Sequence, residues 1–415
     1  MPKQIVVIGA GFAGFWSAFS AKRLVDLEDK AADIEVTVIA LEPSLVMRPR
    51  LYEAEPASML MPLESMFKDA GIRFVRGFAD KIDTNKQNVK VSSQDGEETL
   101  VAYDRLVLAA GSSVVKPVAV TGLEQHAFDI DSLEAASKLE TQLKNLENLP
   151  DSAARNTVVV CGAGFTGIEL VTELPKRMAD LPLKPKFILV DSADMLGSTL
   201  GSGPRPIIEE AMRGLGIETK LGSRITALDA DGLALASGEH IDAKTVMWTA
   251  GVRASRLTQQ ITGPKNDHGR LLVDQQLRVP SCPNVFATAD CAAAFTDTKG
   301  HYTTMSCQHA PVLGRISGHN AAADLLNLPL KEYSQEEYVT CLDLGAWGTV
   351  VTYGWDRDVK LTGDLAKRAK QNINQNVINP PSDAEAALAA ARPDASEGNS
   401  SEGNSSERRL KPSRL

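Results

Sequence analysis

Two short glycine-rich segments carry the clearest chemical signal in the sequence. They read GAGFAG at residues 9–14 and GAGFTG at residues 162–167. In such a turn the first glycine allows the tight bend after a strand, the second lets the backbone approach a pyrophosphate, and the third lets the helix pack on the strand. The helix N-terminus then offers N–H groups and a favourable dipole to the phosphates. We therefore expect two dinucleotide sites, built on Gly9, Gly11, Ala13 and Gly14 and on Gly162, Gly164, Thr166 and Gly167.

An acidic residue is expected where the second strand of each unit ends, because its carboxylate accepts hydrogen bonds from the adenosine ribose. The first unit reads VIALEP there and offers Glu42, for which a surface-loop glutamate is the alternative. The second unit reads ILVDSAD and offers Asp191, with no arginine directly after it. A carboxylate at this position favours the 2′-hydroxyl of NADH and repels the 2′-phosphate of NADPH. We expect NADH as the nucleotide, with NADPH less favoured.

The elements that must position these turns occur twice along the chain. We expect strands at 4–8 and 34–40 with a helix from about 11 to 25, and the same order restarts at 157. Each half continues with a strand-rich segment that ends in LVLAAG or VMWTAG. The small residues Ala110, Gly111 and Gly251 in these segments would let the backbone turn past a bound cofactor. Residues 1–110 and 157–251 thus look like one plan used twice.

Composition and charge exclude several classes of function. The chain has 415 residues, a net charge of −9 and a sequence pI of about 5.3, so a nucleic-acid partner is not expected. The start MPKQIVVIGAG runs straight into a strand, and no apolar run of membrane-spanning length is found, so neither a signal peptide nor a transmembrane segment is expected. We expect a cytoplasmic protein, with peripheral contact to a membrane left open.

The cysteines and histidines point away from thiol and metal chemistry. Five cysteines without paired spacing favour a reducing compartment. Flavin disulfide reductases need two close cysteines after the first βαβ unit, and that region has none. The six histidines lack ligand spacing, so no metal is expected.

The order of the two glycine turns, the two AG turns and NVFATADCA resembles the flavoproteins with two dinucleotide-binding domains. Over residues 3–330 the chain is most similar to the type II NADH dehydrogenases and the related apoptosis-inducing-factor-like flavoproteins. In these proteins the first Rossmann unit binds FAD and the second binds NAD(P)H, with the nicotinamide laid on the flavin. The resemblance implies an α/β fold with two Rossmann-like domains of the glutathione-reductase type and a short C-terminal region. The expected limits are 1–120 and 281–335 for FAD, 121–280 for NAD(H), 336–379 for a small C-terminal region and 380–415 for a disordered tail.

The resemblance also implies roles for single residues on the FAD side. Asp290 in ATADCA would hold the ribityl–pyrophosphate region, with Ala289 where relatives usually have glycine. Gln308 matches a glutamine beside the flavin pyrimidine ring at the start of a helix, whose N-terminus would stabilise negative charge on the reduced flavin. Arg48 lies in RPRLYE, the segment that passes the isoalloxazine. Ala79 would touch the adenine through its backbone alone.

Glu169 and Gln308 are the expected catalytic residues, because both match positions beside the flavin. Glu169 either tunes the flavin where it meets the nicotinamide or serves as a structural carboxylate at a helix start. Two features depart from the respiratory members of the family: Val312 replaces a second glutamine, and LAKRAKQNINQNVINPP is too polar for a strong membrane anchor. The departures leave the electron acceptor open.

The leading hypothesis is an FAD-dependent oxidoreductase in which NADH gives hydride to flavin N5 and the electrons pass to a quinone or another small acceptor. One alternative is a pathway-dedicated flavoenzyme that acts on a soluble metabolite. Another is a redox-sensing flavoprotein with slow turnover. A monomer or a homodimer is expected.

Overall fold

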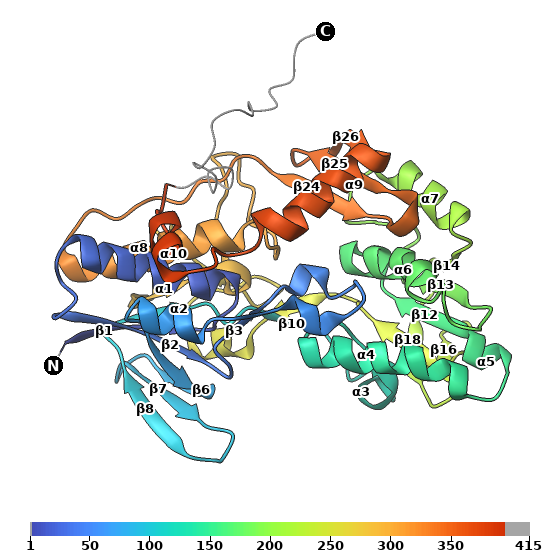
Figure 1. Ribbon diagram of the computed structural model, residues 1–415, viewed down its shortest axis with the longest axis horizontal. Coiled ribbons are helices and arrows are strands. Elements are labelled where there is room, and N and C mark those ends of the chain that lie inside the picture. The colour runs from blue at the N-terminus through green and yellow to red at the C-terminus, as the bar shows by residue number, and fades with distance from the viewer. Residues whose placement is uncertain (1, 395–415) are drawn as a thin grey trace, which may run out of the picture.

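The computed structural model describes residues 2–394, and Figure 1 shows two α/β units side by side with a smaller C-terminal unit next to the second. The first unit is built on a six-stranded sheet of order β21-β22-β9-β1-β2-β5, which is parallel except for β21. Its strands are β1 (Lys3–Ile8), β2 (Ile34–Ala40), β5 (Arg73–Arg76), β9 (Arg105–Leu108), β21 (Arg278–Val279) and β22 (Cys282–Ala287).

Both faces of this first sheet are covered, which explains why β1 is apolar throughout. Ile5 and Val7 join the core under the helices, whereas Val6 and Ile8 join the core on the opposite face. The helices are α1 (Phe12–Leu27) and α8 (Ala310–Leu326), and the opposite face carries the three-stranded sheet of β6 (Phe78–Asp83), β7 (Asn88–Ser92) and β8 (Glu98–Ala102).

Helices α1 and α8 pack so closely that glycine is required at their contact. A Cβ on Gly318 would lie 2.0 Å from the carbonyl oxygen of Ser17, and one on Gly314 would lie 2.5 Å from that of Ala13. The Ser17 hydroxyl also lies 3.1 Å from the carbonyl oxygen of Gly314. The contact joins the first glycine turn to a segment about three hundred positions later in the chain.

We predict that Gly318→Ala lowers the free energy of unfolding by about 1–3 kcal/mol, because the added methyl group forces two backbones apart. Chemical denaturation of the purified variant measures this change. Gly164→Ala is the matched control, since a Cβ there meets nothing within 4 Å. Equal unfolding midpoints for the two variants would contradict the close-packing interpretation.

The second unit repeats the plan with a five-stranded parallel sheet of order β11-β18-β12-β13-β14. Its strands are β11 (Ala127–Phe128), β12 (Thr157–Cys161), β13 (Lys186–Val190), β14 (Glu218–Lys220) and β18 (Thr245–Trp248). The helices are α4 (Leu133–Asn145), α6 (Phe165–Arg177) and α7 (Arg205–Gly214). A three-stranded antiparallel sheet of β15 (Ile225–Leu228), β16 (Gly232–Leu235) and β17 (His240–Asp242) corresponds to β6–β8.

Two short strands link the units where the chain crosses between them. β10 (Ser112–Val114) pairs antiparallel with β19 (Val252–Ala254), so the outward and return crossings lie side by side. Gly111 and Gly251 precede these strands with φ values of +65° and +86°, a region that favours glycine. The two AG turns of the sequence are therefore the places where the chain leaves each sheet.

The C-terminal unit lies against α6 of the second unit (Figure 1). It consists of β24 (Val339–Asp343), β25 (Thr349–Tyr353), β26 (Asp358–Thr362) and α9 (Gly363–Asn372), followed by a π-helical turn, η7 (Ile373–Val377). Among residues 2–394, no helix has the length and apolar character needed to cross a bilayer.

The expected disorder from residue 380 onward is wrong for residues 384–390, which form helix α10 (Ala384–Ala390). The Asp383 side chain accepts a hydrogen bond from the Ala386 N–H and so caps the helix. Ala384 and Ala387 are buried as α10 packs against α1. Alanine favours the helix, and its small side chain allows close contact, so a segment that looks featureless by composition becomes part of the core. Residues 395–415 lie outside the described residues.

Shorter elements complete the described chain. They are β3 (Ser44–Val46), η1 (Arg48–Arg50), η2 (Pro56–Met59), β4 (Leu60–Pro62), α2 (Glu64–Asp69), α3 (Leu123–His126), η3 (Leu146–Asn148), α5 (Ala153–Asn156), η4 (Arg256–Gln260), β20 (Leu271–Leu272), η5 (Ala289–Cys291), β23 (Ala292–Ala293) and η6 (Gly345–Trp347).

Candidate active site

In the first glycine turn, two of the three glycines have no space for a side chain and one does. Gly9 has φ +111°, and a Cβ there would lie 2.3 Å from the carbonyl oxygen of Ala109. A Cβ on Gly14 would lie 1.9 Å from the carbonyl oxygen of Gly9. At Gly11 a Cβ meets nothing within 4 Å, so this glycine faces open space instead of its own fold.

The second glycine turn repeats this pattern. Gly162 again has φ +111°, and a Cβ on Gly167 would lie 1.8 Å from the carbonyl oxygen of Gly162. A Cβ on Gly164 meets nothing within 4 Å. Neither α1 nor α6 has a side-chain cap or an acidic residue in its first turn, so the N-terminal N–H groups are not held by a side chain. Both turns thus have the shape and the donors that a pyrophosphate requires.

The two ribose-binding candidates differ in their surroundings. Glu42 is half-exposed after β2, and its carboxylate forms an ion pair with Arg76. Asp191 follows β13, and its Oδ1 accepts a hydrogen bond of 2.7 Å from the Ala193 N–H. Its Oδ2 accepts another from the Ala163 N–H, inside the second glycine turn. Asp191 is therefore fixed beside that turn, whereas Glu42 is held only by a surface ion pair.

On the proposed FAD side, three polar side chains contact one another: Arg48, Ser112 and Asp290. The Ser112 hydroxyl donates to Asp290 Oδ2 at 2.6 Å, and Arg48 Nη1 donates to the Ser112 hydroxyl at 3.1 Å. Arg48 Nη1 also lies 3.9 Å from Asp290 Oδ2. The structure thus brings Arg48 and Asp290 together, and Ser112, which the sequence did not single out, joins them.

Asp290 is presented by a short turn, η5, with an unusual backbone. Ala289 adopts φ +49°, a left-handed conformation that glycine accepts more readily, which gives a physical reason for glycine in relatives. The buried guanidinium of Arg270 supports the turn, since it lies 3.5 Å from the Ala289 carbonyl oxygen and donates to the Thr303 hydroxyl at 2.6 Å. Burial lowers the pKa of Arg270. A buried cation thus holds the backbone directly before Asp290.

Gln308 does not start a helix, because α8 begins at Ala310 with His309 as its N-cap. Its side chain bonds to the first residue of β24: in the amide orientation that satisfies both atoms, Nε2 donates to the Val339 carbonyl oxygen at 2.7 Å and Oε1 accepts from the Val339 N–H at 3.2 Å. Gln308 therefore ties the start of the C-terminal unit to the segment that precedes α8. Ala79 lies in β6 at a bulge in its pairing with β7.

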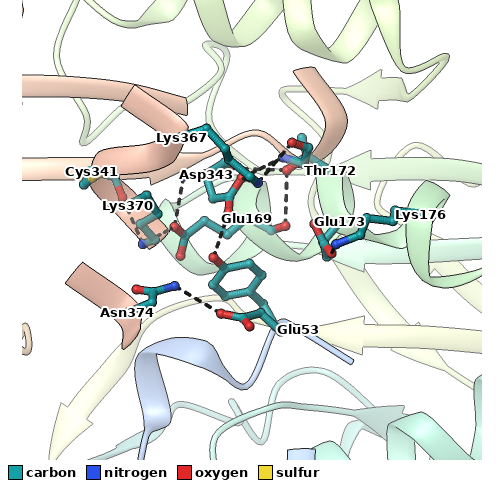
Figure 2. A network of polar contacts seen from close by, with 12 residues as sticks. Glu53, Glu169, Thr172, Glu173, Lys176, Cys341, Asp343, Lys367, Lys370 and Asn374 are labelled. Carbon is teal, nitrogen blue, oxygen red and sulfur yellow. Dashed lines mark hydrogen bonds and ion pairs between the residues drawn. The ribbon is translucent and has the colours of Figure 1, made fainter. Parts of the chain in front are cut away.

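Glu169 lies at the centre of a buried polar network, shown in Figure 2. It occupies the second turn of α6, not the helix start, and is 5% exposed. Its Oε1 accepts hydrogen bonds from Lys370 Nζ at 2.8 Å and from the Asp343 N–H at 3.0 Å. Burial raises the pKa of the Glu169 carboxyl to about 7, against the opposing effect of the Lys370 ammonium. Burial acts to lower the pKa of Lys370, but the charge and the hydrogen bond of Glu169, with a smaller contribution from nearby cysteines, together outweigh it, and the pKa is raised.

A second carboxylate, Asp343, joins three parts of the chain at this network (Figure 2). Its Oδ2 accepts a hydrogen bond of 3.0 Å from the Tyr52 hydroxyl, which comes from the RPRLYE segment. Its Oδ1 pairs with Lys367 Nζ at 2.5 Å, from α9. Burial, together with the nearby carboxylates, raises the pKa of Tyr52. Asn374 Nδ2 donates to Glu53 Oε1 at 3.1 Å and ties η7 to the same segment.

Sequence reasoning missed Lys367, Lys370 and Asn374, although their spacing carried a signal. Lys367 and Lys370 are three positions apart, which places them on one face of α9, and Asn374 follows in η7. Lys370 and Asn374 are buried at 6% and 7% exposure, whereas Leu365 on α9 is 61% exposed. The side of α9 that carries Lys370 therefore faces the protein interior, as does the fully buried Ala366.

The cysteines act as packing residues. None of the five forms a disulfide, and Cys307 is the one that is not buried. Burial raises the pKa of Cys291 to about 12 and that of Cys341 to about 11, so neither thiolate is favoured near neutral pH. Within residues 2–394, no three His, Cys, Asp or Glu side chains are placed to hold a metal ion.

Comparison with known proteins agrees with this arrangement. The family model for pyridine nucleotide-disulphide oxidoreductases matches residues 3–312. An NADH dehydrogenase-like protein of Mycobacterium tuberculosis is 42% identical over 398 residues, 94% of this chain and 98% of that protein. A type II NADH:quinone oxidoreductase of Staphylococcus saprophyticus is 27% identical over 390 residues, with 88% and 93% covered. The solved structure of NDH2 from Plasmodium falciparum in complex with NADH has a TM-score of 0.73 at 14% identity, with 90% and 94% covered. The chain thus belongs to the pyridine nucleotide-disulphide oxidoreductase family and is an NAD(P)H oxidoreductase that resembles the NADH dehydrogenases.

Proposed function

We propose that the protein is an FAD-dependent NADH oxidoreductase that passes electrons to a quinone or a similar small acceptor. The observation that carries the proposal is the pair of glycine turns, each with an open middle glycine in front of an uncapped helix N-terminus. One such turn would suit a single nucleotide, whereas two in one chain suit an enzyme that brings two nucleotides together.

The first unit is the proposed FAD site. Gly11 leaves room for the pyrophosphate, the α1 N-terminus offers N–H donors, and Asp290 with Arg48 lies beside them. Gly111 and Ala110 would line the passage between the units, and Glu42 would accept from the adenosine ribose. FAD, when bound, supplies the flavin ring that takes a hydride from NADH and hands two electrons on.

The Glu169–Lys370 pair gives the chain a proton-holding group and a cation at the proposed meeting point of the cofactors. With a pKa near 7, the Glu169 carboxyl can hold or release a proton at neutral pH. The buried Lys370 ammonium can stabilise negative charge in its vicinity, because the interior screens charge weakly. Gln308 contributes by fixing β24, the strand that ends at Asp343.

NADH is the proposed nucleotide at the second turn, where Gly164, Thr166 and Gly251 would line the site. We predict that Asp191→Asn lowers the preference for NADH over NADPH by about tenfold, or about 1.4 kcal/mol. The amide oxygen can keep one backbone hydrogen bond while the charge that repels the 2′-phosphate is lost. Competitive binding of the two nucleotides measures the ratio, and Glu42→Gln in the first unit is the control. An unchanged ratio in Asp191→Asn would contradict the assignment.

One observation favours a second candidate, an oxidoreductase for a soluble acceptor. Val312 lies on α8 and packs against the core of the first unit, where respiratory members carry a second glutamine. The site then lacks this second amide, which could bind a quinone carbonyl. An acceptor screen with soluble quinones and non-quinone acceptors separates the two candidates.

The direct test is to purify the full chain, record its visible spectrum and add NADH without oxygen. The expected result is a bound yellow flavin that is bleached by NADH and more slowly by NADPH. If no flavin co-purifies or can be reconstituted, the proposed function is wrong. If flavin binds but neither nucleotide bleaches it, the NADH part is wrong.

A further inference from the structure

Asp131 connects the segment between β11 and α4 to both the crossing strand and the proposed FAD site. Its Oδ2 accepts a hydrogen bond of 2.9 Å from the Val114 N–H in β10. Its Oδ1 forms an ion pair with Arg48 Nη2. Neighbouring Asp129 pairs with Lys116 at 2.9 Å and binds the same two segments together. Asp129 Oδ1 also accepts a hydrogen bond of 3.0 Å from the Asp131 N–H, which an asparagine oxygen at 129 can keep. Of the two carboxylates, Asp131 is the one that pairs with Arg48.

The two sides of the Arg48 guanidinium face different partners. Nη2 is held by Asp131, and Nη1 is directed at Ser112 and Asp290. The Arg48 side chain is 34% exposed, so its own packing does not fix it. An arginine side chain has about 2 kcal/mol of rotamer entropy to lose. A fixed partner on one side of the guanidinium reduces the part of this entropy that is lost when a ligand binds on the other side.

We propose that Asp131 is a positioning residue for the FAD site, which acts by holding Arg48 toward Ser112 and Asp290. The ligand is the anionic diphosphate region of FAD, and the inference rests on the proposed function. Asp131 itself does not touch the cofactor in this proposal, since its two oxygens are used by Val114 and Arg48.

If the Asp131 charge is removed, positioning and simple electrostatics predict changes of opposite sign in the Kd for FAD. A carboxylate near a diphosphate repels it, so removal of the charge alone would tighten FAD binding. If Asp131 acts through Arg48, removal leaves the guanidinium free to reorient and FAD binding weakens. The sign of the change therefore distinguishes the two effects.

The experiment compares Asp131→Asn with Asp129→Asn in the full-length protein. The asparagine amide oxygen can still accept a hydrogen bond from the Val114 N–H, so the contact between residue 131 and β10 is kept. We expect the Kd for FAD, measured by flavin fluorescence on reconstitution of the deflavinated chain, to rise about five- to tenfold in Asp131→Asn, the size of a partly exposed charge-assisted hydrogen bond. Asp129→Asn should change the Kd less than twofold, and the unfolding midpoints of the two apoproteins should agree.

A double-mutant cycle with Arg48→Met tests the route through Arg48. In the Arg48→Met background, Asp131→Asn should leave the Kd unchanged or lower it, because only the repulsion remains. Equal weakening in both backgrounds, or tighter FAD binding in Asp131→Asn alone, would overturn the inference. Failure of the wild-type chain to bind FAD would instead contradict the proposed function, so the two failures are distinguishable.

Discussion

Gly11→Val should remove FAD from the protein while the fold stays intact. The backbone at Gly11 is extended, with φ −69° and ψ −171°, and a Cβ there meets nothing within 4 Å. Valine is therefore compatible with the apoprotein, but its side chain fills the space that a pyrophosphate needs. We expect the Kd for FAD to rise by at least about 100-fold, or about 2.8 kcal/mol. Flavin absorbance per protein after purification and an FAD titration measure the loss.

Gly164→Val is the matched variant in the second unit, where the N-cap geometry is nearly the same. It should retain FAD but no longer be reduced by NADH. The crossed pair assigns each nucleotide to its unit, because each variant should lose one ligand alone. If Gly11→Val keeps its flavin, or if Gly164→Val loses it, the assignment of FAD to the first unit fails. Circular dichroism of both variants should match the wild type.

The repeated α/β plan could be predicted because its signals are local. A glycine turn is read from six residues, and the buried strands around it are apolar throughout, as in β12 with its fully buried Thr157–Cys161 run. The same repetition predicted turns at Gly111 and Gly251, whereas the crossing between the units at these turns came from the structure. The fold class was predicted correctly because the local patterns and the global arrangement agree.

The surroundings of Glu169 could not be predicted because they depend on contacts distant in sequence. Its partner Lys370 lies about two hundred positions away, on a helix that looks like a polar surface helix. Spacing shows that Lys367 and Lys370 share a face of α9, but it does not show which face is turned inward. Asp131 and Ser112 were missed for the same reason, since each acts through a partner in another segment.

Helix α9 supplies charged groups to the candidate site. Lys367 and Lys370 of α9 contact Asp343 and Glu169, whereas Leu365 of the same helix is 61% exposed. The C-terminal unit thus contributes charges to the site in addition to the apolar contacts of Leu342, Leu344 and Val350 with the core that includes α6. The charged part of its attachment to α6 should depend on pH through the Glu169–Lys370 pair.

Lys370→Met is expected to destabilise the protein at high pH and to have little effect at low pH. Glu169 is buried, so without Lys370 its charged form has no compensating cation, and breaking such a pair costs about 3–5 kcal/mol. An acid with a raised pKa in the folded state binds protons more tightly there than when unfolded, so stability falls as pH rises from the ordinary value of 4.5 through the folded value. Loss of Lys370 raises the pKa of Glu169 in the folded state above about 7. The variant should therefore lose about 1.4 kcal/mol per pH unit relative to wild type above pH 7.

Urea unfolding at pH 5, 7 and 8 measures this dependence, and two further variants identify its cause. The double variant Glu169→Gln with Lys370→Met should recover most of the loss at pH 8, because no unpaired charge stays buried. Lys138→Met breaks an exposed pair with Glu134 and should leave the pH dependence unchanged. A deficit in Lys370→Met that is equal at pH 5 and pH 8 would mean that packing, not the Glu169 charge, is what Lys370 supports. A loss of stability in Lys370→Met that grows with pH and disappears with Glu169→Gln would establish that α9 supplies the counter-charge to Glu169.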